Sequence, residues 1–372
     1  MRKNLNNLRR YISIGLMSGT SQDGIDVGII ETDGKKIYEI GPSLFYPYQE
    51  SFRKDLRQVI DSSIKEGKPT KDKTVGLQLS KLHIIAMQNL ISSIGIDNKF
   101  KYPDIIGFHG HTVIHSPNDG FTQQIGDSSL ISKKMNLPVV GDFRLNDIVN
   151  GGEGAPLTPI FHKAIFNNIS YPVAIINIGG ISNITWINNL EENIIAFDLG
   201  PGNCLLDEWI SIYTNERYDK NGKISSTGKS NERWLTKAFN DEFFLKSYPK
   251  SLDRGYFSFN GLSNLNLEDG AATLASFTAK SIIYGINQCP TPPKDIYLSG
   301  GGRKNNTIIR ILKQNLSSKI MMIDELNFDG DMLEANAFAY LAVRSLKNYP
   351  LTFPNTTGVK EPTLGGKIFY ND

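Results

Sequence analysis

The stretch GLMSGTSQDGIDVGII, residues 15–30, sets an acidic turn with glycines and hydroxyl side chains between two apolar runs. Gly19 and Gly24 leave the backbone of this turn uncovered, so its N–H groups could approach phosphate oxygens closely. Asp23 and Asp26 would not bind phosphate themselves, but they can hold Mg²⁺ through water. An ordinary hairpin turn explains the same residues, and no GKS or GKT follows as it would in a Walker loop. The stretch therefore predicts either a phosphate site or a plain turn.

A second acidic glycine turn, DLGPGN, spans residues 198–203. Asp198 ends an apolar run that we expect to be a strand, and Gly200 and Gly202 precede an expected helix. A carboxylate in this place lies at the edge where open α/β sheets bind their ligands, beside a helix N-terminus that favours anions. A capping or turn aspartate is the alternative. We favour a functional role for Asp198.

Three glycines also separate an expected strand from an expected helix in LSGGGRKN, residues 298–305. Such a turn suits a nucleotide that lies flat against the backbone, and Asn305 would cap the helix that follows. A tight connection without a ligand suits it equally well. The residues alone leave both interpretations open.

Three of the five histidines lie close together in GFHGHTVIHSP, residues 107–117. On a strand His109, His111 and His115 would share a face, so a metal site is arithmetically possible. A spaced partner motif such as HExxH is missing, which weakens that hypothesis. We favour a polar edge that faces a sugar, or histidines that are bonded within the structure.

Charged residues gather in GDFRLNDIVNGGEGAP, where Arg144 lies among Asp142, Asp147 and Glu153. The arginine could form a structural ion pair, or it could offer its planar fork to a ligand carboxylate. Another carboxylate, Glu334, comes at the start of a helical pattern. It would favour the helix dipole there, or it could reach into a cleft.

These residues need strands and helices to position them, and short apolar runs alternate with helical patterns as in α/β proteins. Residues 11–17, 26–31 and 37–44 predict an antiparallel meander. Residues 172–189 repeat the order strand, glycine turn, strand. Small residues in the helix expected over 331–346 would permit close packing; they are Ala335, Ala337, Ala339 and Ala342.

The glycine- and proline-rich segment after Pro138 predicts a boundary between two lobes. We expect an N-terminal lobe of residues 1–138 with 347–372, and a C-terminal lobe of residues 139–346. A chain of 372 residues is long enough for two such domains, each with its own core.

The composition argues against several classes of protein. Forty basic and 38 acidic residues give a net charge of +2, so nucleic-acid binding is not expected. Two cysteines without metal spacing suit a reducing compartment. Apolar runs fall short of the ~20 residues of a membrane span, and the start of the chain imitates a signal peptide only faintly. We expect a cytoplasmic protein.

Taken together, these stretches resemble the anhydro-N-acetylmuramic acid kinase family from Gly15 to about Gly366. Each motif alone is weak evidence for the family, but so many motifs in the same order along the chain make the resemblance specific. They are MSGTSQDGID (17–26), FHGHT (108–112), DFR (142–144) with Asp147, GGEGAPLTP (151–159), NIGGISN (177–183), FDLGPGN (197–203), SGGG with Asn305 (299–305), EANAFAYLA (334–342) and TGVKEPTLGG (357–366). The resemblance implies two ribonuclease-H-like, actin-like ATPase lobes with a nucleotide cleft between them.

The resemblance also implies a reaction that uses ATP, water and Mg²⁺. The family hydrolyses the ring of 1,6-anhydro-N-acetylmuramic acid and phosphorylates O6, which gives N-acetylmuramic acid 6-phosphate and ADP in peptidoglycan recycling. Asp198 would activate the water, and Glu334 would be an additional sugar or water contact. An ordinary sugar kinase without ring cleavage is the alternative, and a non-catalytic ATP-binding member of the superfamily is a rival from another class.

Binding residues follow from the same resemblance. ATP, with its phosphates and their Mg²⁺, would meet Gly19, Thr20, Ser21, Gln22, Asp23, Gly24, Ile25, Asp26, Gly179, Gly180, Gly300, Gly301, Gly302 and Asn305. The sugar would meet His109, His111, Arg144, Asp147, Gly202 and Asn203. Arg144 is the candidate for the lactyl carboxylate, and Asp23 and Asp26 would hold Mg²⁺ through water. The expected partners are ATP and the amino sugar, and a homodimer is left open.

Two departures from the family pattern introduce titratable groups. His111 and Glu153 stand where the family has neutral amides, so sugar binding could become sensitive to pH. Leu199 replaces a threonine beside Asp198 and removes a hydroxyl. None of the departures removes the proposed catalytic carboxylate.

Overall fold

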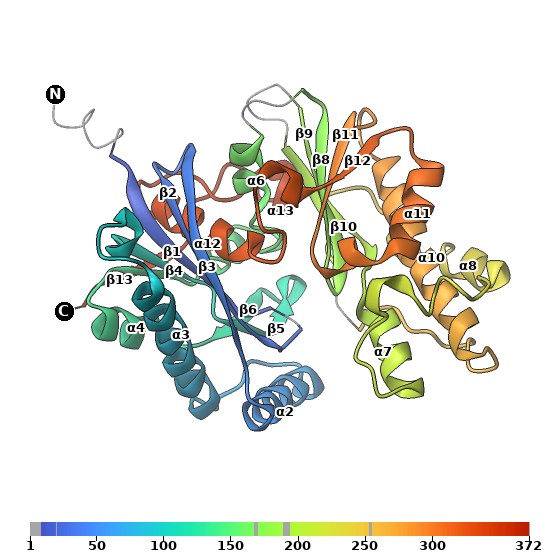
Figure 1. Ribbon diagram of the computed structural model, residues 1–372, viewed down its shortest axis with the longest axis horizontal. Coiled ribbons are helices and arrows are strands. Elements are labelled where there is room, and N and C mark those ends of the chain that lie inside the picture. Colours follow the sequence, from blue (N-terminus) through green and yellow to red (C-terminus); the bar gives the residue numbers. More distant parts are fainter. Residues whose placement is uncertain (1–8, 20, 167–169, 189–193, 253–254, 372) are drawn as a thin grey trace. The chain divides into compact units, whose positions relative to one another are not determined.

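The computed structural model describes residues 9–19, 21–166, 170–188, 194–252 and 255–371. The chain forms two compact units (Figure 1). Unit 1 comprises Met1–Asn167 with Met332–Asp372, and unit 2 comprises Asn168–Asp331. Both boundaries differ from the predicted ones, because about 30 residues after Pro138 and the helix before Lys347 belong to unit 1.

Strand pairing and helix packing explain these corrected boundaries. β7 (Val139–Gly141) pairs parallel with β4 (Ile105–Phe108) and antiparallel with β13 (Lys367–Phe369). α12 (Leu333–Leu346) packs on β1, β2 and β4. The glycine- and proline-rich composition after Pro138 thus marks loops inside unit 1 instead of a linker.

Unit 1 is built on a six-stranded sheet in the order β13-β7-β4-β1-β2-β3. The meander predicted at the start of the chain is confirmed, because β1 (Tyr11–Met17), β2 (Gly24–Thr32) and β3 (Ile37–Pro47) pair antiparallel. β5 (His111–Ser116) and β6 (Phe121–Ile125) form a separate hairpin.

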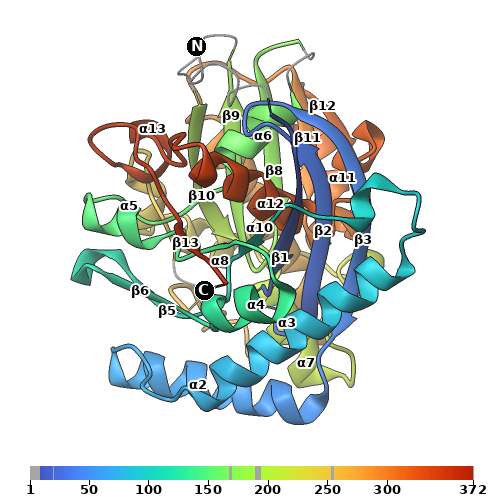
Figure 2. The same cartoon turned by 90° about the vertical axis from the view of Figure 1, so that its left-hand side faces the viewer.

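Helices cover both faces of this sheet (Figures 1 and 2). α12 covers one face, and α3 (Thr74–Ser93) and α4 (Ser128–Met135) pack on the other. The other α-helices in the described part of unit 1 are α2 (Glu50–Glu66), α5 (Leu145–Val149), α6 (Pro159–Ile165) and α13 (Pro354–Thr357). The apolar core on the α3 side contains Ile14, Leu16, Leu79 and Met87.

Unit 2 repeats the same topology in a five-stranded sheet of order β10-β9-β8-β11-β12. β8 (Val173–Ile178), β9 (Ile181–Ile187) and β10 (Ile194–Pro201) form the antiparallel meander. β11 (Asp295–Ser299) and β12 (Lys319–Met322) then add in parallel. A meander of three strands followed by parallel strands is the ribonuclease-H-like order, so the predicted fold class is confirmed for each unit.

The helices of unit 2 lie around one apolar core. They are α7 (Cys204–Tyr213), α8 (Glu232–Ala238), α9 (Glu242–Leu245), α10 (Leu267–Ile286) and α11 (Asn306–Asn315). α10 contacts β9, β10, α7 and α11, so it is the central helix of this unit. Trp209 on α7 and Phe277 on α10 are among the largest fully buried side chains of unit 2.

α12 touches the unit 1 sheet with its backbone. Gly28, Gly15 and Gly107 face one another across β2, β1 and β4. A Cβ on Gly15 would lie 1.8 Å from the carbonyl oxygen of Ala335, and one on Gly107 would lie 2.1 Å from that of Phe338. The predicted close packing of this alanine-rich helix is therefore confirmed, and the row of glycines makes it possible.

None of the helices within the described part of the chain is long and apolar enough to cross a membrane.

Gly107→Ala should destabilise unit 1 by about 2 kcal/mol or more, because its methyl group would force α12 off the sheet. Gly95→Ala is the control, because a Cβ there meets nothing within 4 Å; a change within about 0.5 kcal/mol is expected for it. Urea unfolding followed by far-UV circular dichroism measures both. Equal midpoints for the two variants would contradict the glycine-row contact.

Candidate functional site

The first turn is shorter in the structure than its motif predicts. β1 ends at Met17 and β2 begins at Gly24, so the turn comprises residues 18–23. The N–H of Gln22 donates to the carbonyl of Gly19 at 3.1 Å and closes the turn. A Cβ on Gly19 would meet nothing nearer than 4.0 Å, so the backbone is open to a ligand at this point.

Side chains from other elements fix the two ends of this turn. The Ser18 hydroxyl lies 2.7 Å from the Tyr48 hydroxyl and 2.8 Å from Nδ1 of His111. Arg53 donates to the carbonyl of Gln22 at 2.8 Å. The anchors Tyr48 and Arg53 lie outside the recognised motifs, so no motif pointed to them.

Two of the residues predicted to contact phosphate lie in a strand and not in the open turn. Gly24 and Ile25 belong to β2: a Cβ on Gly24 would strike β3, and the Ile25 side chain is buried in the core. Their predicted place in an open turn is wrong, because strand pairing begins earlier than the glycine suggested. Thr20 lies outside the described residues.

Asp23 and Asp26 offer hard oxygen donors beside the turn. Asp23 is exposed and accepts from the Ser21 hydroxyl at 2.5 Å, and Asp26 is half-buried on β2. Among the described residues no group of three or more His, Cys, Asp or Glu side chains could hold a metal ion. Mg²⁺ keeps several waters and needs only one or two carboxylates, so these two residues fit a water-bridged ion.

Glycine turns far apart in the sequence meet in unit 2. The N–H groups of Gly202 and Cys204 donate to Gly180 at 2.9 and 3.2 Å, and that of Asn203 donates to Gly179 at 2.7 Å. The Asn203 amide also donates to the carbonyl of Ile178 at 3.0 Å. The donors of Gly202 and Asn203 thus support the turn at β8–β9, and we no longer expect them to bind the sugar directly.

The third glycine turn packs against the same place. A Cβ on Gly300, whose φ is +74°, would lie 2.3 Å from the Asn177 side chain, and one on Gly302 would strike Ile178. A Cβ on Gly301 meets only the Asn203 amide, at 4.0 Å, so its face is open. The predicted cap is confirmed, because Asn305 accepts from the first N–H groups of α11.

Arg303 holds this turn in place and was treated as a spacer in the sequence motif. Its guanidinium donates to both oxygens of Asp324, to Asp331 at 2.6 Å and to the carbonyl of Gly300 at 3.1 Å. Burial alone would lower the pKa of Arg303, but the bonds to the two aspartates raise it. The sequence signal for this role of Arg303 is its place directly after three glycines.

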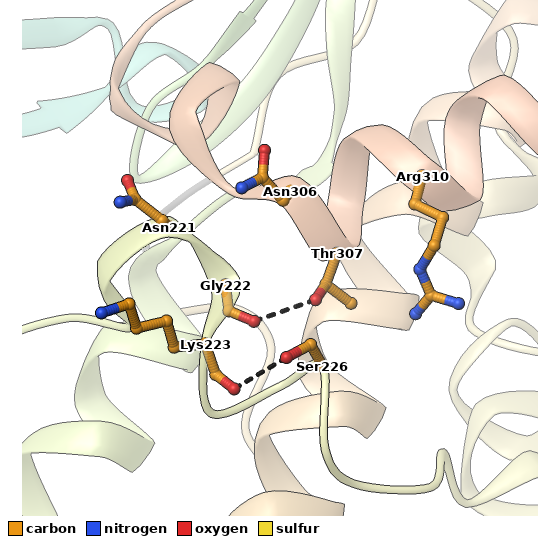
Figure 3. A pocket seen from close by; sticks show the side chains of 7 residues that line it. All are labelled: Asn221, Gly222, Lys223, Ser226, Asn306, Thr307 and Arg310. Atoms are coloured by element: carbon orange, nitrogen blue, oxygen red, sulfur yellow. Dashed lines mark hydrogen bonds between the residues drawn. The ribbon is translucent and has the colours of Figure 1, made fainter.

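A hollow of about 350 Å³ lies next to this turn, at the start of α11 (Figure 3). Its lining residues are Asn221, Gly222, Lys223, Ser226, Asn306, Thr307 and Arg310. Figure 3 shows Lys223 and Arg310 on opposite sides of it. The carbonyl of Gly222 accepts from the Thr307 hydroxyl at 3.1 Å, which ties the two walls together.

Asp198 lies on β10 at a bulge, where the register with β9 shifts. Its N–H donates to the carbonyl of Lys250 at 3.0 Å, and its carboxylate accepts from the N–H of Leu252 at 2.8 Å. The side chain is half-buried, so it is both held and reachable. Asp198 was predicted to end its strand, but β10 continues past the bulge to Pro201, and the segment that holds the carboxylate was missed.

Arg144 lies in unit 1 beside β4 and the loop at 150–154. Its Nε donates to Nε2 of His109 at 3.1 Å, and Nη1 donates to the carbonyl of Gly154 at 2.7 Å. Glu334 contributes to the charges around this arginine, and burial raises the pKa of the glutamate although Arg144 opposes the change. The structure thus brings together three of the predicted residues: His109, Arg144 and Glu334.

Asp147 has a different role from the predicted one. Its carboxylate accepts from the N–H of Gly154 at 2.6 Å and from the hydroxyl of Thr357 at 2.6 Å, and it is 1% exposed. Both oxygens are therefore used to hold the loop against the segment near α13. We no longer expect Asp147 to contact a sugar, because protein donors occupy its carboxylate.

The clustered histidines do not converge on one point. His109 bonds Arg144, His111 bonds Ser18, and Nδ1 of His115 lies 2.9 Å from the Thr122 hydroxyl. Burial lowers the pKa of His111 to about 4. His111 is therefore neutral at pH 7, so the predicted pH sensitivity would lie well below neutral pH.

All five histidines lie in unit 1 and all three tryptophans lie in unit 2. Burial lowers the pKa of His83, His111 and His115 to about 4 and that of His162 to about 3. Burial and Arg144 hold the pKa of His109 well below 6.5. Below pH 6.5 the unfolded chain therefore binds protons that folded unit 1 does not.

Acid should consequently destabilise unit 1 selectively. Between pH 6.5 and about 4, its free energy of unfolding should fall by up to about 1.4 kcal/mol per pH unit for each histidine. At pH 5, circular dichroism should detect an early unfolding transition that tryptophan fluorescence does not follow. The prediction would be contradicted if the circular dichroism and tryptophan fluorescence transitions were separate at pH 7 but coincided at pH 5.

Comparison with known proteins agrees with the motifs. The family model for anhydro-N-acetylmuramic acid kinase matches residues 10–371. A protein of that name from Zymomonas mobilis subsp. mobilis is 41% identical over 367 residues, covering 96% of this chain and 100% of the relative. A protein of the same name from Rhizobium johnstonii is 42% identical over 366 residues, covering 96% of this chain and 98% of the relative.

Solved structures give more distant matches. The (R)-2-hydroxyglutaryl-CoA dehydratase component A of Acidaminococcus fermentans is 12% identical, with a TM-score of 0.45 and coverage of 90% of this chain and 99% of that one. A ROK family glucokinase from Streptomyces griseus is 11% identical, with a TM-score of 0.33 and coverage of 89% and 99%. On the family model and the two close relatives, the chain belongs to the anhydro-N-acetylmuramic acid kinase family.

Proposed function

We propose that the protein hydrolyses the 1,6-anhydro ring of 1,6-anhydro-N-acetylmuramic acid and transfers the γ-phosphate of ATP to O6. The observation that carries this proposal is the carboxylate of Asp198, held by the N–H of Leu252 on a bulge of β10. Membership of the family supports the choice of sugar. The products would be N-acetylmuramic acid 6-phosphate and ADP, and we place the reaction in the cytoplasm.

Asp198 would act as a general base. Its carboxylate would take a proton from water as the water oxygen bonds to the anomeric carbon. The bond between C1 and O6 breaks in the same step, and O6 then attacks the γ-phosphate. A carboxylate suffices as base because the proton leaves late, when the C–O bond is already breaking.

Backbone groups of the two open glycine turns would bind the phosphates. Gly19 and Gly301 have no neighbouring atom nearer than 4.0 Å to an added Cβ, which permits the close approach that a phosphate needs. Asp23 and Asp26 would hold Mg²⁺ through water. When bound, the ion neutralises phosphate charge, and the residues supply positioning.

The nucleoside end of ATP would lie in the hollow at the start of α11. The hollow adjoins Asn305 and the third glycine turn, and its volume of about 350 Å³ suits a nucleoside. Arg310 offers a planar cation that can stack on a base. Arg310→Ala should raise the KM for ATP severalfold and leave the KM for the sugar unchanged; equal KM values for ATP would contradict this placement.

The sugar carboxylate would bind to Arg144. His109 and the carbonyl of Gly154 fix the guanidinium at 3.1 and 2.7 Å, so its planar fork is already oriented. Burial raises the pKa of Glu334, which favours the protonated carboxyl and would let it donate a proton to a sugar oxygen or a water. His109 thus acts on the sugar through Arg144.

An isotope experiment distinguishes ring cleavage from ordinary sugar phosphorylation. The protein is incubated with ATP, Mg²⁺ and the anhydro sugar in ¹⁸O-water, and the product is analysed by mass spectrometry. Label at the anomeric oxygen supports the proposal. Phosphorylation without label, or phosphorylation of ordinary hexoses only, would favour the plain sugar kinase, and no sugar-stimulated ADP release would favour a non-catalytic ATP-binding protein.

Asp198→Asn should keep the fold and lower kcat by about 10²-fold or more, because the amide cannot take the proton from water. Glu208→Gln is the matched control, since it removes an exposed carboxylate from α7 of the same unit. Steady-state kinetics measures kcat, and tryptophan fluorescence checks that unit 2 is folded. A kcat of Asp198→Asn close to that of the control would remove Asp198 from the mechanism.

A further inference from the structure

Lys250 is a buried cation next to the proposed base. The side chain is 7% exposed, and its ammonium donates to the carbonyls of Phe243 and Lys246 at 3.2 and 3.1 Å. The same ammonium lies 4.6 Å from the ring centroid of Phe243 and 5.7 Å from that of Phe197. Phe197 directly precedes Asp198, so the lysine contacts the strand that carries the base.

A buried ammonium is costly unless protein groups replace its water. Two carbonyls and two aromatic faces do so here, yet an uncharged side chain of similar length would fill this space without the cost. Burial lowers the pKa of Lys250 to about 8, while the charge of Asp198 raises it. The lysine and the aspartate thus favour each other's charged form.

The backbone around Lys250 holds Asp198 directly. The carbonyl of Lys250 accepts from the N–H of Asp198 at 3.0 Å, and the N–H of Leu252 donates to its carboxylate at 2.8 Å. These two bonds come from residues two apart in one segment. The ammonium binds the carbonyl of Phe243 on α9 and that of Lys246, where the segment begins. It therefore also fixes the donor that orients the carboxylate.

We propose that Lys250 is a positioning residue for Asp198: its buried ammonium fastens residues 246–252, and this segment holds the carboxylate oriented and ionised. The proposal rests on the proposed function, in which Asp198 is the base. The charged groups that face the ammonium in the described structure are Asp198 on β10 and Lys246 on the same segment. Lys246 pairs with Glu242 at 3.4 Å and is largely exposed, so the main buried partner is Asp198.

The sign of the electrostatic effect is fixed. A cation stabilises the ionised carboxylate, so removal of the cation should let Asp198 bind a proton at higher pH. Loss of the proton from Lys250 on the alkaline side should disturb Asp198 in the same direction. Both effects can be measured at Asp198 itself.

Lys250→Met tests the proposal in the full chain, because methionine keeps much of the length and removes the charge. We expect kcat to fall about tenfold or more, with KM values for ATP and sugar within about twofold. The acidic limb of the kcat–pH profile should move to higher pH. Lys250→Arg should restore part of the loss, and Lys237→Met, which removes an exposed lysine from α8 of the same unit, is the control that should match the wild type.

A second readout does not depend on turnover. The carboxyl ¹³C signal of Asp198, assigned by its absence in Asp198→Asn, should titrate at higher pH in Lys250→Met. In the unsubstituted protein the same signal should show a second inflection where Lys250 titrates. This measurement remains decisive if Lys250→Met does not fold.

The outcomes separate the two proposals. A folded Lys250→Met with wild-type kcat and pH profile would overturn the role of Lys250, as would an Asp198 signal with no inflection in the unsubstituted protein. Equal losses in Lys250→Met and Lys250→Arg with an unmoved Asp198 titration would mean packing only, which also overturns it. Wild-type turnover in Asp198→Asn would instead refute the proposed base.

Discussion

The backbone of α12 lies directly on a row of three glycines, and unit 1 depends on this contact. Gly28, Gly15 and Gly107 stand side by side on adjacent strands, and any side chain at the latter two would overlap the helix backbone. Because the helix backbone lies so close to the strands, the position of Glu334 in its first turn is fixed relative to the sheet. The same helix brings residues 332–372 back to a sheet that began with residue 11.

Glycines serve a different purpose in unit 2, although its strand order is the same. There they allow three turns to meet, and backbone amides that could have faced a ligand instead join Gly179 and Gly180 to the start of α7. Gly301 keeps an open face within that group. Arg303 then ties the third turn to Asp324 and Asp331, so a structural ion pair supports the place where we propose that phosphate binds.

Local patterns predicted much of this arrangement. The first meander, the strand–turn–strand unit of residues 172–189, the Asn305 cap and the close-packing helix follow from periodicity, capping chemistry and small residues, all of which are local. The lobe boundaries were misplaced because β7 and α12 are assigned to unit 1 only by pairing with distant strands. Asp147 was misjudged for a similar reason, since its second partner, Thr357, is 210 residues away. Lys250 gave no signal, because a lysine in a polar segment reads as exposed until the fold buries it.

The division of the chain between the units has a consequence for synthesis. Unit 2 is one continuous stretch, whereas unit 1 is split, and residues 332–372 include both α12 and the edge strand β13. A ribosome therefore synthesises every residue of unit 2 before it makes the helix that covers the glycine row. Until then one face of the first sheet stays bare, and the nascent chain depends on its later-made part to hide it.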